Sequence, residues 1–99
     1  MDEKELLMKV KTELRAFEVL LDIEEPVQAF EKWQKESTEM NVDEVVRKIV
    51  EEKLKELIFV EKNEKDALKK EIKRLCKFID DALLFLEVFP QANKILESK

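Results

Sequence analysis

The chain has 99 residues, enough for one domain with a single hydrophobic core but not for two. Hydrophobic residues make up 44% of it and charged residues 43%, mostly Lys and Glu, and glycine is absent. Such a composition is typical of thermophilic proteins and of idealised helical designs. Without glycine, tight hairpin turns are not expected, and the net charge of −5 argues against bulk attraction to nucleic acid or to anionic membranes.

The apolar residues recur at steps of three and four along most of the chain, which is the period of an amphipathic helix. The breaks between these segments are short, and short joints favour antiparallel neighbours. We therefore expect one all-α domain over residues 1–99, an antiparallel four-helix bundle with a short fifth C-terminal helix. The expected helices cover residues 3–23, 26–38, 42–60, 64–89 and 91–97.

The first helix carries one apolar stripe, and charged residues occupy its other side. It should end before Pro26, because a residue that precedes proline avoids the α region. Pro26 suits the first turn of the second helix. The stripe of the first helix consists of Leu6, Leu7, Val10, Leu14, Phe17, Leu20 and Leu21, and the expected buried face of the second consists of Val27, Phe30, Trp33, Ser37 and Met40.

The third helix has a marked start. Asn41 is the expected N-cap with Glu44 three residues on, and Met40 and Val45 occupy the positions of a hydrophobic staple. Lys53 interrupts the apolar stripe that follows. The stripe consists of Val42, Val46, Ile49, Val50, Leu57 and Val60.

Residues 61–66, EKNEKD, contain no apolar side chain and separate the third helix from the fourth. Asn63 can cap a new helix that has Asp66 in its first turn. We interpret this stretch as the turn of a helical hairpin. The alternative is one unbroken helix over residues 42–89.

The fourth helix is the longest and the most apolar near its end, where Pro90 stops it. Phe78, Phe85 and Phe89 flank its core stripe, and Ile95 and Leu96 belong to the short terminal helix. The core stripe consists of Leu68, Ile72, Leu75, Ile79, Ala82, Leu83 and Leu86.

Four side chains of the fourth helix are predicted to form a protein interface: Leu84, Phe85, Val88 and Phe89. Leu84 and Val88 lie on the face away from the core stripe, and a helix that is apolar all round is either central or has a partner. Three candidates could cover these side chains: a second copy of the chain, the Ile95–Leu96 tail, or a different protein. We favour a homodimer, because most soluble oligomers are symmetric.

Five cations share the back of the same helix: Lys69, Lys70, Lys73, Arg74 and Lys77. A basic stripe can follow phosphates along a nucleic acid. No aromatic residues interleave with these cations, and the negative net charge repels a polyanion. A solvated face that pairs with acidic residues of neighbouring helices is the simpler interpretation.

Little in the sequence points to catalysis. The absence of histidine removes the commonest general base and metal ligand, so Ser37 and Cys76 lack an activating partner. Without glycine there is no phosphate-binding loop. We predict no catalytic, cofactor or metal site. The single cysteine and the lack of a membrane-length apolar run suggest a cytoplasmic protein.

These patterns predict a small, non-catalytic interaction or assembly module that self-associates through the end of its fourth helix. The alternative is an accessory nucleic-acid-binding subunit that uses the basic stripe of residues 69–77.

Overall fold

The structure is a computed structural model that describes residues 2–61 and 64–89. Its elements are α1 (Glu3–Leu20), α2 (Pro26–Glu39), α3 (Glu44–Glu61) and α4 (Lys65–Val88). Within these ranges every regular element is a helix, which confirms the predicted all-α class. The expected fifth helix at 91–97 and the expected cap at Asn63 lie outside the described residues.

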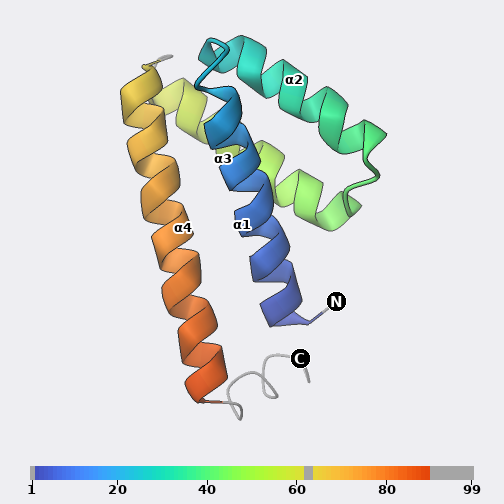
Figure 1. The fold of residues 1–99 in the computed structure, drawn as a ribbon, viewed down its shortest axis with the longest axis vertical. Coiled ribbons are helices and arrows are strands. Elements are labelled where there is room, and N and C mark those ends of the chain that lie inside the picture. Colours follow the sequence, from blue (N-terminus) through green and yellow to red (C-terminus); the bar gives the residue numbers. More distant parts are fainter. Residues whose placement is uncertain (1, 62–63, 90–99) are drawn as a thin grey trace.

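The helices form two pairs that cross (Figure 1). α1 and α4 lie side by side and run in opposite directions. α2 and α3 form a hairpin that runs obliquely across this pair, and α1 packs against all three other helices. The C-terminal half of α4 lies beside α1 and away from the hairpin, so one side of it has no neighbouring helix in the described chain.

α1 buries the stripe that its sequence predicts. Asp2 caps its N-terminus, because the Glu5 backbone N–H donates to Asp2 Oδ1 at 2.8 Å. The helix ends at Leu20, three residues earlier than expected, and a turn over residues 21–24 leads to the extended backbone of Glu25 before Pro26. The buried members are Val10, Leu14, Phe17, Leu20 and Leu21, with Leu6 and Leu7 packed at the edge of the core.

α2 buries only part of the expected face: Trp33 and Ser37 are buried as predicted, and Phe30 packs at the edge of the core. Pro26, Ala29, Trp33 and Ser37 are buried, whereas Val27 is 42% exposed and Met40 77%. The observed residues are spaced by three, four and four, so the inward face is rotated from the predicted one. Ala29 is completely buried, and a pattern of large apolar residues does not identify so small a side chain as part of the core.

Trp33 fixes α2 against α1. Its side chain is only 2% exposed, and its Nε1–H donates to Glu13 Oε1 on α1 at 3.1 Å. The ring of Phe30 stacks on the indole with centroids 6.1 Å apart. The carboxylate therefore satisfies the one polar group of a large buried side chain, as buried indoles require.

The link between α2 and α3 corrects the predicted capping. Asn41 has φ 54°, in the left-handed region, and it ends α2 instead of starting α3. Its N–H bonds to the Thr38 carbonyl at 3.2 Å, and the Val42 N–H bonds to the Ser37 carbonyl at 3.0 Å. These two bonds form a Schellman motif, which is usually built on glycine. Asparagine takes that position in a chain that has no glycine.

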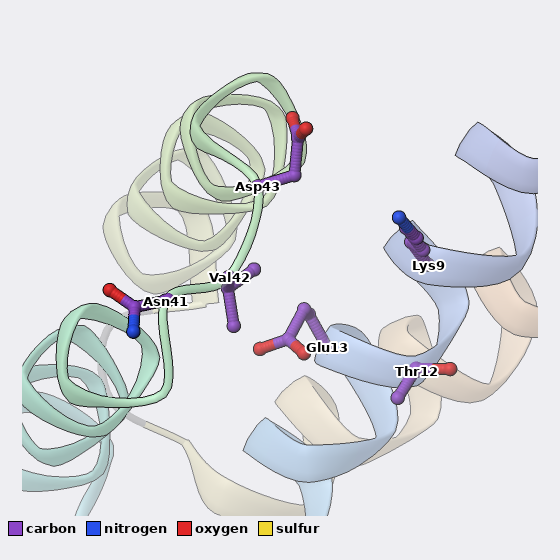
Figure 2. Close-up of a pocket in the computed structure, with 6 residues that line it drawn as sticks. All are labelled: Lys9, Thr12, Glu13, Asn41, Val42 and Asp43. Atoms are coloured by element: carbon purple, nitrogen blue, oxygen red, sulfur yellow. The ribbon is translucent and has the colours of Figure 1, made fainter. Parts of the chain in front are cut away.

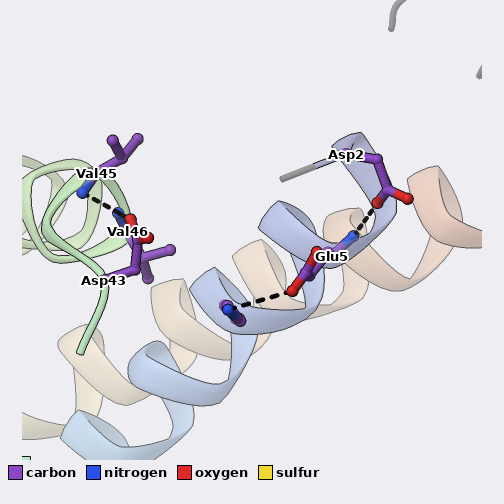
Figure 3. A network of polar contacts seen from close by, with 6 residues as sticks. Asp2, Glu5, Asp43, Val45 and Val46 are labelled. Carbon is purple, nitrogen blue, oxygen red and sulfur yellow. Dashed lines mark hydrogen bonds and ion pairs between the residues drawn. The ribbon is translucent and has the colours of Figure 1, made fainter. Parts of the chain in front are cut away.

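Asp43 is the residue that caps α3. Its Oδ1 accepts from the backbone N–H of Val45 at 2.9 Å and of Val46 at 3.4 Å (Figure 3). The cap is thus two residues later than predicted, and the expected staple fails with it. Met40 and Val45 are 77% and 57% exposed.

The left-handed residue gives a direct test of the Schellman motif. We expect Asn41→Ala to lower the free energy of unfolding by about 1 kcal/mol, because a Cβ without a compensating polar group is unfavourable at positive φ. Asn41→Gly is the matched control and should change stability by less than about 0.5 kcal/mol. Urea unfolding followed by circular dichroism measures both. Equal losses for the two variants would contradict the assigned conformation.

α3 and α4 complete the core. On α3 the buried residues are Val46, Val50, Leu54 and Leu57, whereas the expected Ile49 and Val60 are 43% and 60% exposed. Leu54 continues the four-residue spacing of Val46 and Val50, although the predicted stripe does not include it. On α4 the predicted stripe is largely correct. Its buried members are Leu68, Ile72, Ile79 and Leu86, with Cys76 beside them and Leu75 and Leu83 packed at the edge of the core.

Candidate functional site

The C-terminal half of α4 has an inner apolar face and an outer one. Ile79 and Leu86 are buried, 6% and 5% exposed, and Leu83 packs at the edge of the core. These residues recur at steps of three and four and face α1. Since they already form a complete inner stripe, the remaining apolar residues of the segment must lie elsewhere on the helix.

The outer face contains the four residues predicted as an interface. Leu84 and Val88 are each 59% exposed, and Phe85 and Phe89 are each 52% exposed. The rings of Phe85 and Phe89 lie 5.0 Å apart between centroids, so the two aromatic side chains form one contiguous surface. The structure thus places all four on the surface. Whether another molecule binds there stays a prediction.

Phe78 belongs to the same surface, although it was not among the predicted interface residues. It is 71% exposed, two turns before Phe85. The sequence contained the necessary signal, because Phe78, Phe85 and Phe89 share one flank of α4. What it lacked was the position of α1, which leaves this flank open.

A groove of about 470 Å³ runs between this flank and the first turns of α1. Its walls are mostly apolar, with one carboxylate on each helix, Glu3 and Asp81. The remaining residues that line it are Leu7, Phe78, Ala82, Phe85 and Leu86. An apolar groove flanked by exposed aromatic rings is a surface that can receive apolar side chains of a partner.

The predicted basic stripe is partly neutralised inside the molecule. Lys69 pairs with Asp22, which lies in the turn after α1, and Arg74 pairs with Glu71 at 3.0 Å. Lys70, Lys73 and Lys77 are exposed and have no ion pair among the described residues. Two of the five cations therefore already have carboxylate partners.

The Lys69–Asp22 pair affects both of its members. The hydrogen bond from the ammonium group lowers the pKa of Asp22 and raises the pKa of Lys69, against a smaller opposing effect of desolvation. Lys65 and Lys73 lower the Asp22 pKa further by their charge. The pair links α4 to the turn after α1. A second ion pair, Lys65 with Glu25 at 3.6 Å, links α4 to the start of α2.

A second hollow lies between α1 and the α2–α3 link, and Figure 2 shows the six residues around it: Lys9, Thr12, Glu13, Asn41, Val42 and Asp43. Its charged groups already have partners. Glu13 accepts from the Trp33 indole, and Asp43 caps α3. Lys9 pairs with Glu5 at 3.3 Å. Because its charged groups already have partners within the fold, we assign this hollow a structural role.

Cys76 and Ser37 are buried. Desolvation raises the pKa of the Cys76 thiol, and the nearby Glu18 charge raises it further, so the reactive thiolate is disfavoured. The Ser37 hydroxyl donates to the Gln34 carbonyl at 3.1 Å. Within residues 2–61 and 64–89, no group of three or more Cys, Asp or Glu side chains is placed to hold a metal ion.

The described helices include none that is long and apolar enough to cross a membrane. No family model matches the chain, and neither a curated protein nor a solved structure matches it significantly. The exposed face of α4 and the groove beside it are therefore the features on which a functional proposal can rest.

Proposed function

We propose that this protein is a small, non-catalytic interaction or assembly module of the cytoplasm, a helical bundle that forms a homodimer. The proposed contact surface is the C-terminal half of α4, with Leu84, Phe85, Val88 and Phe89. The observation that carries the proposal is the exposure of these four side chains, each more than half exposed, on a helix whose opposite face is buried in the core.

The energetic reason is the amount of apolar surface in one place. Burial of apolar surface contributes about 25 cal/mol for each Å² removed from water, and aromatic side chains provide the most surface per residue. Single exposed apolar residues are ordinary, but a contiguous group on successive turns of one helix is typical of an interface. A two-fold contact covers such a group with an identical one.

The alternative function, nucleic-acid binding through Lys69, Lys70, Lys73, Arg74 and Lys77, has weaker support. Two of these cations have intramolecular carboxylate partners, and a partner phosphate would have to compete with them. The net charge of −5 adds a long-range repulsion that weakens binding further.

A pair of charged substitutions tests the dimer. We expect the parent protein to sediment as a dimer, and Leu84→Glu with Val88→Glu to sediment as a folded monomer, because four carboxylates would meet at the contact. The expected loss of affinity is on the order of a hundredfold or more, as for central apolar residues of an interface. Analytical ultracentrifugation measures the mass, and circular dichroism confirms that the variant is helical.

A matched control separates this effect from a general effect of added charge. Val45 and Val60 on α3 are exposed to the same degree as Val88, at 57% and 60%, and they lie on another helix. Val45→Glu with Val60→Glu should leave the dimer intact. A monomeric parent would contradict the proposed self-association. An unfolded Leu84→Glu, Val88→Glu variant would show that these side chains are interior.

A further inference from the structure

The outer face of α4 carries a second stripe with the spacing of a helix–helix seam. Phe78, Ala82, Phe85 and Phe89 follow one another at steps of four, three and four residues, the alternation that places side chains along a line facing a partner helix. Three of the four are lining residues of the groove beside α1. This stripe lies next to the buried one, so α4 can pack on α1 and on a further helix at the same time.

Charge is distributed unevenly along the same helix. Residues 65–77 contain six cations and two carboxylates, a net charge of +4, whereas residues 78–89 contain three carboxylates and no cation, a net charge of −3. Lys65 and Lys69 pair with carboxylates outside α4, and Asp80 pairs with Lys11, so the charge left to attract a partner is +2 on the first half and −2 on the second. The charge therefore reverses where the outer stripe begins. A helix with one basic half and one acidic half is complementary to a copy of itself that runs in the opposite direction.

We propose that a second copy of this chain covers the outer stripe by packing its α4 antiparallel to the first, so that the basic half of each helix lies along the acidic half of the other. The inference rests on the proposed function, which already names a second copy, and adds the direction of the two helices and the aromatic stripe of the contact, with Leu84 and Val88 beside that stripe. Phe78 and Phe85 of one copy then meet the groove of the other, and the two α1–α4 pairs form a four-helix arrangement across the two-fold axis.

The charge pattern disfavours a parallel contact between copies. In a parallel arrangement, the two basic halves would lie side by side and so would the two acidic halves, and like charges in register oppose association. The uniformly charged helix of an unrelated partner would be attracted by one half of α4 and repelled by the other. A reversed copy of α4 matches both halves.

Charge exchange along α4 tests the direction of packing. The acidic variant is Lys70→Glu, Lys73→Glu and Lys77→Glu, which takes the first half from +2 to −4 once the intramolecular pairs are set aside. The basic variant is Asp81→Lys with Glu87→Lys, which takes the second half from −2 to +2. The substitutions avoid Lys69, Arg74 and Asp80, because these residues form ion pairs within the chain. A combined variant carries all five changes.

The dimer dissociation constant, measured by sedimentation equilibrium at low salt, gives the outcome. Antiparallel packing predicts that the acidic and the basic variant each bind themselves on the order of tenfold more weakly than the parent, and that the combined variant recovers most of the loss. Added salt should reduce these differences. Circular dichroism checks that every variant is helical.

Two results would overturn the inference. An acidic variant that dimerises as tightly as the parent, or more tightly, would mean that its basic half does not face an acidic one. A combined variant that dimerises no more tightly than the acidic or the basic variant would mean the same. If the parent protein is a dimer, either result contradicts only the antiparallel direction. A monomeric parent would contradict the proposed self-association itself. The two failures are therefore distinguishable.

Discussion

Phe17→Ala is expected to lower the free energy of unfolding by about 3–5 kcal/mol, because it removes a large ring from a closely packed core and leaves a cavity. Phe17 is completely buried on α1, the helix that contacts all three others. The loss of one ring therefore weakens several interfaces at once. Since a small domain has about 5–15 kcal/mol of stability in total, this single change can bring the protein close to unfolding.

The matched control is the same substitution at the surface. Phe59 on α3 is 85% exposed, so Phe59→Ala removes a ring that is mostly in water. We expect it to change stability by no more than about 0.5 kcal/mol. Urea unfolding at one fixed protein concentration measures both variants, since dimerisation makes stability depend on concentration. Similar losses at the two positions would show that the assigned burial is wrong.

Leu54→Ala is expected to lower the free energy of unfolding by about 2–5 kcal/mol, the range for deletion of a buried leucine side chain. Leu54 is completely buried, in line with Val46 and Val50 on the inner face of α3. The comparison on the same helix is Ile49→Ala. Ile49 is 43% exposed, and we expect a loss of about 1 kcal/mol or less.

This pair of substitutions distinguishes the structure from the sequence pattern. The sequence pattern places Ile49 in the core stripe and omits Leu54. In the structure Leu54 is buried and Ile49 is partly exposed to solvent. Thermal or urea unfolding by circular dichroism ranks the two variants directly. A larger loss for Ile49→Ala than for Leu54→Ala would mean that α3 is rotated about its axis relative to the structure described above.

The sequence by itself determined the all-helical class and the positions of the breaks. Pro26 and the charged run at 61–66 interrupt the apolar pattern, and helices begin or end within a few residues of each. The inner stripes of α1 and α4 were also predictable. On α1 only one side of the helix is apolar over most of its length, so the burial of that side follows from the hydrophobic effect alone.

The caps between α2 and α3 could not be assigned from residue type. Asn41 and Asp43 are both good N-cap residues, and asparagine is also tolerated in the left-handed conformation. The choice depends on where the α2 backbone stops. Once its last carbonyls bond to the Asn41 and Val42 N–H groups, the first free cap position is Asp43.

Only the tertiary structure decided which apolar residues of α2 and α3 face inward, and which flank of α4 stays open. Each of these helices has apolar residues over more than one stripe, and with 3.6 residues per turn two adjacent stripes have equally regular spacing. The contacts with neighbouring helices determine which of the two stripes is buried. Trp33 and Ala29 turn α2 onto α1, Leu54 replaces Ile49 in the core, and Phe78 stays outside because α1 covers the other side of α4. The surface proposed for assembly is the stripe that these contacts left uncovered.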